Sequence, residues 1–438
     1  QSAPQVRRLF EGMGIKSMVK TKKGKDSYNK DAMALIDHPL AAAVTSFRGA
    51  NNIKNYYAKF DELMDQEGVL HCSLQQAGAR TGRFSCREPN LQNIPREGLS
   101  VDDMLTDPSG SLVNNVGQEG NRGDGKTSRL TREELEGYGA VRAAFVPRPG
   151  HFLLMADWRQ VELMVLADYA DDQTMIEAFR LGLDIHALAA TAAHGPLPPG
   201  ATEAFAKWWR MMGKGINFGL VYGMGVALLA LKIGKSKAEA KAFMDTYFAR
   251  FPGVRLFLDR TTSIAKGWAK NKWGRRRHLP QEAMYKMPNF LVQGSSADLM
   301  KERLTAVCGA LVAAAMASMP LLPIHDELMN EIPYGEAYDA IPIIAREMET
   351  CDRLKVPLKV DLKWSSKSWA DKEPLDCDGC EGSGVALDVP KASLVTALAA
   401  GDAATLRAAG AKKCAACDGR GWDLNRLRIP RTTKRRAA

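Results

Sequence analysis

The stretch TEAFAKWWRMMGKGINFGLVYG, from Thr202 to Gly223, decides how the rest of this sequence is interpreted. Four of its side chains recur at intervals of four residues: Arg210, Lys214, Phe218 and Tyr222. On an α-helix, that spacing places all four on one gently spiralling face. Two cations followed by two aromatic rings suit a long ligand that is anionic at one end and planar at the other.

Three glycines interrupt the same predicted helix, at Gly213, Gly215 and Gly219. Glycine costs about 1 kcal/mol relative to alanine inside a helix, so a helix built only for packing rarely carries three. We therefore expect the missing side chains to permit a close approach to the helix, or its movement. An amphipathic helix with solvated cations is the alternative interpretation of this stretch.

Composition limits the remaining possibilities. The chain has 438 residues, of which 45% are hydrophobic, enough for a large core and more than one subdomain. A net charge of +10 favours a polyanionic partner. No apolar run reaches the length of a membrane span, and no secretory signal opens the chain. Because the sequence begins with Gln1 rather than Met, we expect a fragment of a longer protein.

Two predicted strands end on carboxylates. The apolar run 152–156 leads into Asp157, and the run 321–324 leads into His325, Asp326 and Glu327. Three polar residues at the tip of an apolar hairpin are costly unless they face a cleft or bind a cation. Carboxylate oxygens are hard ligands, which favour Mg²⁺ over Zn²⁺.

These segments together resemble the family A DNA polymerases, the bacterial DNA polymerase I family. The resemblance covers roughly residues 1–370 and rests on motifs that occur in the family's order. They are TGRFS (81–85) and PNLQNIP (89–95) of the palm, DWRQVEL (157–163) and HDE (325–327) of the carboxylate motifs, and the helix at 202–223 of the fingers. Trp158 and Arg159 depart from the family's usual Tyr and Ser.

The resemblance implies an α+β right-hand polymerase fold, with a thumb, a palm built on an antiparallel sheet, and helical fingers. A small C-terminal module with four cysteines follows that has no counterpart in the family. The predicted division is thumb 1–75, first part of the palm 76–170, fingers 171–285, second part of the palm 286–370, and module with basic tail 371–438. A Gly- and Asn-rich loop insertion at about 97–135 is a further departure from the family.

The resemblance also implies the chemistry of template-directed nucleotide addition. Two catalytic Mg²⁺ ions are expected on Asp157, Asp326 and the backbone carbonyl of Trp158, with Glu327 as a secondary ligand and Lys214 as the proton donor to pyrophosphate. Nucleotide binding is expected from Arg210, Phe218, Tyr222, His186, Gln160 and Glu162. DNA binding is expected from Arg83, Asn93, Arg275, Asn289, Gln293 and His325.

The implied partners are primer–template DNA and deoxynucleoside triphosphates, with no membrane partner. We expect a monomer in the cytoplasm of a bacterium or a phage-infected host, with replication accessory proteins as further partners. The N-terminal part of the sequence lacks the acidic cluster that a 3′–5′ exonuclease would need. We therefore expect no proofreading activity within this chain. Two other classes stay open: a single-subunit RNA polymerase, and a nucleic-acid-binding protein with a decayed site.

The last seventy residues contain two copies of Cys-x-x-Cys-x-Gly-x-Gly. Cys377 and Cys380 form the first pair, and Cys414 and Cys417 the second, with 33 residues between them that include an Ala- and Leu-rich helical stretch. Two such pairs predict one structural Zn²⁺ held by four thiolates. A redox dithiol is the alternative. The basic tail, 426–436, is expected to lie near DNA or a partner.

Overall fold

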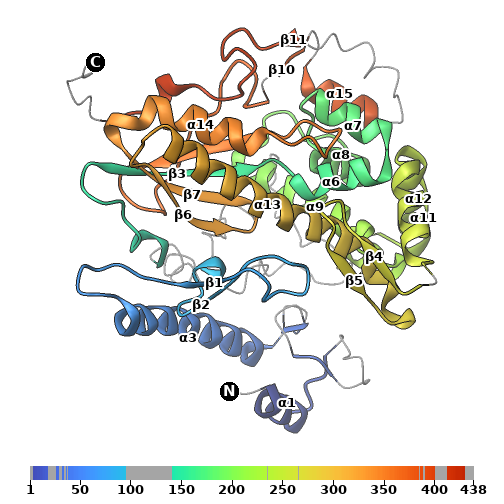
Figure 1. Cartoon of the computed structure of the whole chain (residues 1–438). Helices are drawn as coiled ribbons and strands as arrows, with labels where there is room; N and C mark the ends of the chain where they lie inside the picture. The colour runs from blue at the N-terminus through green and yellow to red at the C-terminus, as the bar shows by residue number, and fades with distance from the viewer. Residues whose placement is uncertain are drawn as a thin grey trace.

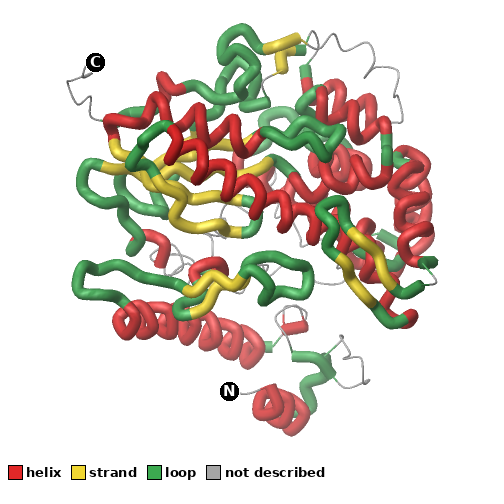
Figure 2. The backbone as a smooth tube through the Cα atoms, in the orientation of Figure 1, coloured by secondary structure: helices red, strands yellow, loops and turns green. Residues whose placement is uncertain are grey.

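The structure is a computed structural model, and it describes residues 3–17, 26–28, 32–33, 36, 38–94, 141–233, 235–264, 266–383, 385–387, 390–399 and 412–429. The predicted insertion at 97–135, most of the basic segment 20–30 and the last nine residues of the chain lie outside this part. Figure 1 shows the arrangement, and Figure 2 separates its helices from its strands. The mixture of helices with an antiparallel sheet confirms the predicted α+β class.

A five-stranded antiparallel sheet lies at the centre of the molecule, in the strand order β6-β7-β3-β8-β9. Its strands are β3 (His151–Trp158), β6 (Met319–Ile324), β7 (Glu327–Pro333), β8 (Val360–Ser365) and β9 (Glu373–Pro374). Because β6 is an edge strand, the proline at position 323 is tolerated there.

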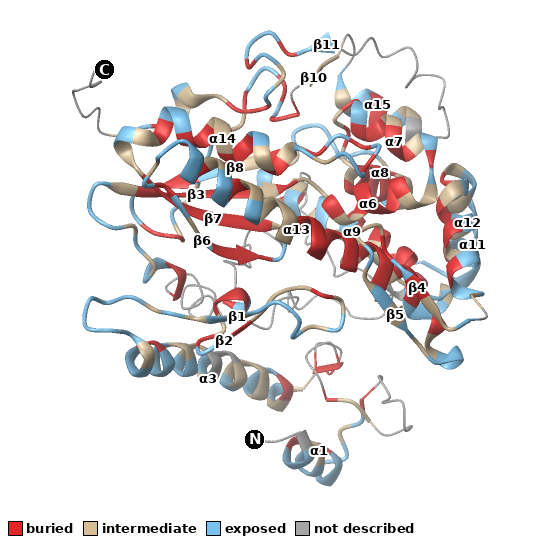
Figure 3. Cartoon of the chain, viewed as in Figure 1, coloured by how far each residue is buried: buried red, intermediate tan, exposed pale blue. Residues whose placement is uncertain are grey.

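Both faces of the central strand β3 are buried (Figure 3). Phe152, Leu154 and Ala156 pack into the large cluster that includes α13 (Met287–Ala313) and α14 (Ala337–Glu349). Leu153 and Met155 face the opposite way, toward a second cluster with the N-terminal part of the chain. This alternation follows from the period of two in a strand, and it fixes which residues of β3 leave the core at its end.

The N-terminal part lies against the second face of the sheet (Figure 1). Its long helix α3 covers Pro39–Leu63. The elements here are α1 (Ala3–Gly12), α3 (Pro39–Leu63), β1 (Ser73–Gln75), β2 (Ser85–Arg87) and the 3₁₀ turn η1 (Leu91–Asn93).

We use "helical lobe" for the elements between residues 161 and 286. They are α6 (Val161–Ala170), α7 (Gln173–Arg180), α8 (Ile185–His194), α9 (Glu203–Val221), α10 (Val226–Ile233), α11 (Lys237–Arg250), α12 (Pro252–Thr262), β4 (Trp268–Lys270), β5 (Arg276–His278) and η2 (Gln281–Lys286). The helix predicted from Thr202 is α9, and the Thr202 hydroxyl caps its first turn by accepting from Phe205 N at 3.2 Å.

The C-terminal module, residues 372–429, is not separate from the rest of the molecule as the sequence suggests. Its strand β9 extends the central sheet, and Leu375, Trp422 and Leu427 are buried in the same apolar cluster as the sheet and the helical lobe. Its helix α15 (Lys391–Ala399) packs on α8. The remaining elements are β10 (Val385–Ala386), β11 (Lys412–Lys413) and η4 (Leu424–Arg426), while η3 (Tyr334–Glu336) precedes α14. The module therefore bridges the sheet and the lobe.

None of the helices in the described part of the chain combines the length and the apolar composition that crossing a lipid bilayer requires.

Candidate active site

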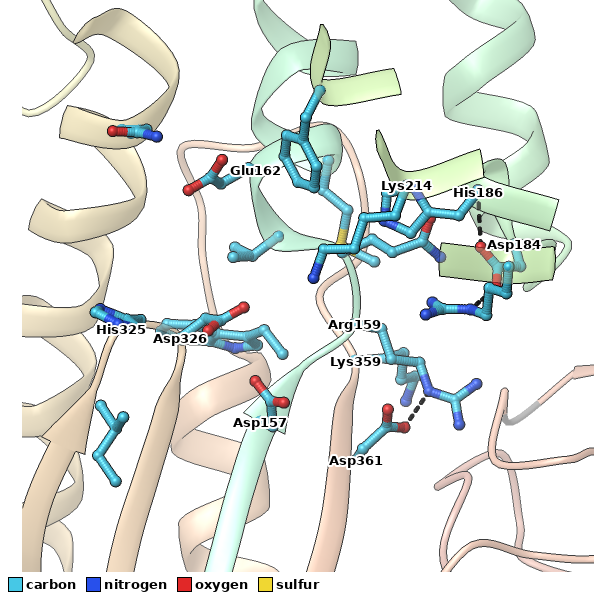
Figure 4. A pocket seen from close by; sticks show the side chains of 18 of the residues that line it. Asp157, Arg159, Glu162, Asp184, His186, Lys214, His325, Asp326, Lys359 and Asp361 are labelled. Atoms are coloured by element: carbon cyan, nitrogen blue, oxygen red, sulfur yellow. Dashed lines mark hydrogen bonds and ion pairs between the residues drawn. The ribbon is translucent and has the colours of Figure 1, made fainter. Parts of the chain in front are cut away.

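A cleft of about 930 Å³ lies where the end of the central sheet meets the helical lobe (Figure 4). Its walls bring together most of the predicted site residues, from segments that lie far apart in the sequence. Those that line it are Arg83, Asn93, Asp157, Trp158, Gln160, Glu162, His186, Arg210, Lys214, Phe218, Tyr222, Gln293, His325 and Asp326.

The two predicted metal-binding aspartates meet at one edge of the sheet. Asp157 is near the end of β3, and Asp326 is in the two-residue turn between β6 and β7. His325 adopts the left-handed conformation (φ 60°) that this tight turn needs, and Trp158 N–H donates to the Asp326 carbonyl at 3.2 Å. The hairpin thus holds Asp326 beside the end of β3, and both carboxylates are only half-buried in the cleft wall.

Oxygen donors at this edge fit Mg²⁺. Asp157 and Asp326 contribute carboxylates, and the Trp158 backbone contributes a carbonyl. The Trp158 indole is buried, and its Nε1 donates to the Met348 carbonyl at 2.8 Å. The departure from the family's Tyr at this position therefore changes the core contacts of the strand, and the role of the backbone carbonyl as a metal ligand stays a prediction.

Glu327 has a different environment from its neighbour Asp326. It begins β7, is 4% exposed, and pairs with Lys372 at 3.1 Å from Oε2. It is not among the described residues that line the cleft. Asp326 lies in the turn before β7, whereas Glu327 is the first residue of the strand and is paired in register with Asp157, so the two neighbouring carboxylates have different surroundings. Its role as a secondary metal ligand stays a prediction.

The four side chains predicted to share one face of α9 lie together. Arg210, Lys214, Phe218 and Tyr222 all line the same cleft as the two aspartates. The Phe218 and Tyr222 rings stack with centroids 5.7 Å apart and planes inclined by 26°. The Lys214 Nζ lies 5.7 Å from the centroid of the Phe218 ring. Cations and rings therefore follow one another along the cleft in the order of the sequence.

One glycine of α9 serves packing between helices. A Cβ on Gly213 would collide with the His186 carbonyl and the Ala190 backbone of α8. The close approach that the sequence predicts is thus at least partly the approach of a neighbouring helix. That contact places His186 beside α9, with its ring 5.6 Å from Phe218.

His186 lies in the cleft wall as a neutral group. It is 2% exposed, and this burial lowers the pKa of its ring to about 3. Asn217 Nδ2 lies 3.2 Å from His186 Nδ1 and also donates to the Ile185 carbonyl at 2.9 Å. Because an amide N–H can only donate, Nδ1 is the acceptor and the proton belongs on Nε2. His186 can therefore offer a neutral hydrogen-bond donor.

Sequence reasoning missed two partners in this wall. Asp184 caps α8 by accepting from His186 N at 2.8 Å, and its second oxygen pairs with Arg210. Asn217 is fully buried, and its Oδ1 accepts from Tyr247 at 2.7 Å. The cap position of Asp184 was a readable signal in the sequence. The long-range contact of Asn217 with Tyr247 was not.

Glu162 is held from two sides. The Tyr222 hydroxyl donates to Oε2, and Arg83 pairs with Oε1. Burial, followed by the charge of Glu162, raises the pKa of Tyr222, so the phenol stays protonated at neutral pH. Gln160 precedes α6 with a left-handed backbone (φ 49°). Its Oε1 is buried without a hydrogen-bond partner among the described residues.

The residues predicted to bind DNA are only partly brought together. Asn93, Gln293 and His325 line the cleft. Arg275 lies outside it, and its guanidinium is held by Asp298 at 2.6–3.1 Å, which raises the Arg275 pKa. Asn289 also lies outside the cleft, and its Oδ1 is buried without a partner in the described part of the chain. The DNA contacts of all these residues stay predictions.

The four predicted zinc ligands form one buried cluster. Candidate ligand atoms of Cys377, Cys380, Cys414 and Cys417 all lie within 4.8 Å of one another. Both sequence copies fold into the same turn. Gly382 N donates to the Cys377 carbonyl at 3.2 Å, and the equivalent Gly419 N donates to Cys414 at 3.0 Å. Positive φ angles of 76° and 74° explain why both turns carry glycine.

Comparison with known proteins places this geometry in a family. The sequence profile of DNA polymerase family A matches residues 1–371. DNA polymerase I of Pseudomonas aeruginosa is 32% identical over 373 residues, which cover 81% of this chain and 36% of that protein. The thermostable DNA polymerase I of Thermus filiformis is 32% identical over 375 residues, which cover 81% and 40%. The chain thus spans less than half the length of these relatives.

A solved structure agrees with these sequence matches. It is the POL domain of Pol1 from M. smegmatis in complex with DNA primer-template and dNTP. It is 29% identical, has a TM-score of 0.68, and aligns over 84% of this chain and 61% of that one. The C-terminal module lies beyond the residues that the family profile matches. Since that profile spans most of the chain, including both aspartates and α9, this chain belongs to DNA polymerase family A.

Proposed function

We propose that this chain is a DNA-directed DNA polymerase that adds deoxynucleotides to a primer 3′-hydroxyl. One observation carries the proposal: Asp157 and Asp326 line the same cleft as Arg210 and Lys214 of α9. Phosphoryl transfer needs positioning and charge neutralisation more than covalent chemistry, and this cleft offers both. The DNA polymerase I relatives and the neighbour solved with primer-template and dNTP support the same function.

The carboxylates of Asp157 and Asp326, with the Trp158 carbonyl, are proposed to hold two Mg²⁺ ions. When bound, these ions supply Lewis-acid activation of the hydroxyl and neutralise charge on the triphosphate. The hairpin turn and the end of β3 fix the two carboxylates relative to each other, so that little reorganisation is needed at the moment of reaction. Glu327, paired with Lys372, is proposed to act from outside the ligand set.

The face of α9 is proposed to bind the incoming nucleotide. Arg210 and Lys214 would contact its phosphates, and Lys214 would give a proton to the leaving pyrophosphate. His186 and Gln160 would add neutral hydrogen bonds. Phe218 would stack against base and sugar, and Glu162 would exclude a 2′-hydroxyl. In this arrangement Arg210 must share or release Asp184 when the triphosphate enters.

The substrate DNA is proposed to contact several polar groups around the cleft. Arg83, Asn93, Asn289, Gln293, Arg275 and His325 are the residues assigned to primer or template. Amides suit the minor groove because purine N3 and pyrimidine O2 accept hydrogen bonds for every base pair. The domain division into thumb, palm and fingers is proposed with the boundaries predicted above.

Primer extension tests the proposal and separates it from its two alternatives. Extension of a labelled primer by deoxynucleotides, with poor incorporation of ribonucleotides, is expected. Preferential use of ribonucleotides would identify the single-subunit RNA polymerase alternative. DNA binding without extension by either substrate would identify a decayed site. The same assay with a mismatched primer end tests the expectation that this chain has no proofreading activity.

The C-terminal cysteines are proposed to bind one structural Zn²⁺, since four thiolates fill a tetrahedral site and leave no open position. The basic tail is proposed to add a salt-dependent contribution to DNA binding. Removing only residues 430–438 tests the tail, because the module up to residue 429 packs into the core. We further propose a monomer in a bacterial or phage-infected cytoplasm, with replication accessory proteins as partners.

A further inference from the structure

Arg159 joins the end of the catalytic strand to the C-terminal module. Its guanidinium pairs with Asp361 of β8, the pair drawn beside Asp157 in Figure 4. The same guanidinium donates to the Glu381 carbonyl at 3.2 Å and lies 3.8 Å from Asp376. Asp376 and Glu381 belong to the module, and Asp361 belongs to the sheet. One side chain therefore satisfies acceptors on both sides of the contact.

The contact is tightly packed. A Cβ on Gly382 would collide with the Arg159 guanidinium, and a Cβ on Gly182 of the helical lobe would collide with Ser383 of the module. Ser383 itself lines the nucleotide cleft. A second link lies alongside, where Lys359 donates from Nζ to the Gly419 carbonyl at 3.2 Å and accepts at its own carbonyl from Arg159 N at 3.0 Å.

Electrostatics explains why an arginine is suited to this position. Asp361 and Asp376 both lie beside the Arg159 guanidinium, so the two carboxylates would repel each other across the contact. A guanidinium between them neutralises this repulsion, and its rigid fork of donors reaches several acceptors at once. The serine usual at this position in the family is too short to do so.

Arg159 also sits at a sensitive place in the backbone. It separates Asp157 from Gln160, which is left-handed and begins the turn into α6, where Glu162 lies. Misplacing a catalytic group by about 1 Å can cost a hundredfold in rate. Because the Arg159 side chain anchors this turn to the module, it influences the positions of Asp157, Gln160 and Glu162 together.

We propose that Arg159 is a positioning residue for nucleotide binding, and that the C-terminal module holds it in place through Asp376 and the Glu381 carbonyl. The module is then a working part of the nucleotide site, in addition to any role of its basic tail on DNA. This inference rests on the proposed polymerase function. It assigns the module an effect on nucleotide affinity, whereas the tail acts on DNA affinity.

The test compares two module carboxylates of the same chemistry. Asp376→Ala removes the module carboxylate that faces Arg159. Asp378→Ala is the matched control, because Asp378 is 90% exposed and pairs with Arg426 within the module. The measurement is the dissociation constant of the complementary deoxynucleoside triphosphate. It is made with the 438-residue chain bound to primer-template that has a dideoxy-terminated primer. This needs no chemical step. The dissociation constant for primer-template is measured in parallel.

Asp376→Ala is expected to weaken nucleotide binding at least about threefold, within the range for residues of one ion-pair network. Arg159→Ala should weaken nucleotide binding to the same extent, and Arg159→Lys should restore part of the lost affinity. The double variant Arg159→Ala, Asp376→Ala should bind the nucleotide no more weakly than Arg159→Ala alone. DNA binding and the Asp378→Ala control should stay within about twofold of wild type. Asp376→Asn, which keeps the side-chain size, repeats the test if Asp376→Ala unfolds.

Unchanged nucleotide affinity in Asp376→Ala and Asp376→Asn would overturn the inference, and so would effects of Arg159 and Asp376 that simply add. Hydrogen exchange of the amides at 157–162 gives a readout without nucleotide, and it should be faster in both Asp376 variants. Equal exchange rates in wild type and variants would also overturn it. Failure of the wild-type chain to extend primers would instead refute the proposed function and leave the exchange measurement valid.

Discussion

The Tyr222 hydroxyl donates its hydrogen bond to Glu162, and so ties the end of α9 to the first turn of α6. Arg83 pairs with the other Glu162 oxygen, which brings a third segment into the same contact. Because α9 carries Arg210 and Lys214 of the cleft and α6 follows β3, this contact links two elements that line the cleft. Any movement of α9 that displaces Tyr222 must break it.

Sugar selection should depend on Glu162. Glu162→Ala is expected to raise ribonucleotide incorporation, because the substitution removes the side chain assigned to exclude a 2′-hydroxyl and also frees Tyr222. The measurement is the ratio of incorporation efficiencies for a deoxynucleotide and its ribonucleotide analogue. Tyr222→Phe separates the two effects, since it keeps Glu162 and loses only the hydrogen bond. An unchanged ratio in Glu162→Ala would remove Glu162 from this role.

Metal-site carboxylates should act on the chemical step. Asp157→Ala and Asp326→Ala are each expected to abolish primer extension while leaving DNA affinity largely intact, since many dispersed cations hold the phosphate backbone. Asp339→Ala is the control, because Asp339 is an exposed carboxylate of α14. Primer extension and a DNA-binding titration check the prediction. Near wild-type extension by either variant would contradict the two-metal assignment.

Discrimination against dideoxynucleotides should depend on the ring at position 218. The family resemblance implies that an aromatic ring without a hydroxyl at this position discriminates against them. Phe218→Tyr is therefore expected to increase termination by dideoxynucleotides, with little change in deoxynucleotide addition. Competition between the two nucleotides in a primer-extension ladder measures the effect. An identical ladder for wild type and variant would count against the placement of α9 along the nucleotide.

Stability should fall in mild acid because of His186. Its pKa is lowered to about 3 by burial, against 6.5 for an ordinary histidine. Between these values the unfolded chain binds more protons than the folded one, so acid favours unfolding. The contribution of His186 to the free energy of unfolding should drop by up to about 1.4 kcal/mol per pH unit as the pH falls from 6.5 toward 3. Well above an ordinary histidine's pKa the group contributes no pH dependence.

Denaturant unfolding of wild type and His186→Gln at several pH values checks this prediction. The variant should lose part of the acid sensitivity between about pH 6.5 and 4, since glutamine does not titrate. His71→Gln is the control, because His71 is an exposed histidine of the N-terminal part. Parallel pH profiles for wild type and His186→Gln would show that His186 does not titrate as its burial implies.

Metal analysis should find one zinc per purified chain. Cys377→Ser is expected to lower the zinc content and the melting temperature, because a buried thiolate site contributes folding free energy when the ion binds. Cys308→Ser is the matched control, since Cys308 is an exposed cysteine of α13 far from the cluster in sequence. A zinc content near zero, with all four cluster thiols freely titratable under native conditions, would contradict the site.

Much of this molecule was determined by local sequence. The four-residue spacing of α9 placed its cations and rings on one face because a helix has a fixed period. The end of β3 and the hairpin turn placed Asp157 and Asp326 because strands alternate and a tight turn exposes its tip. The duplicated cysteine motif produced two equal turns, because the same short-range hydrogen bonds form in each copy.

Only the tertiary structure decided which partners these residues meet. The sequence pattern predicts that Arg210 is a free cation, yet in the structure it pairs with Asp184, 26 positions away. The sequence predicts a separate C-terminal module, yet β9 of this module extends the central sheet. Its Asp376 carboxylate and Glu381 carbonyl lie beside Arg159. Such contacts join segments that no periodicity relates. They depend on the packing of whole elements, whose energies become defined only once the chain has folded.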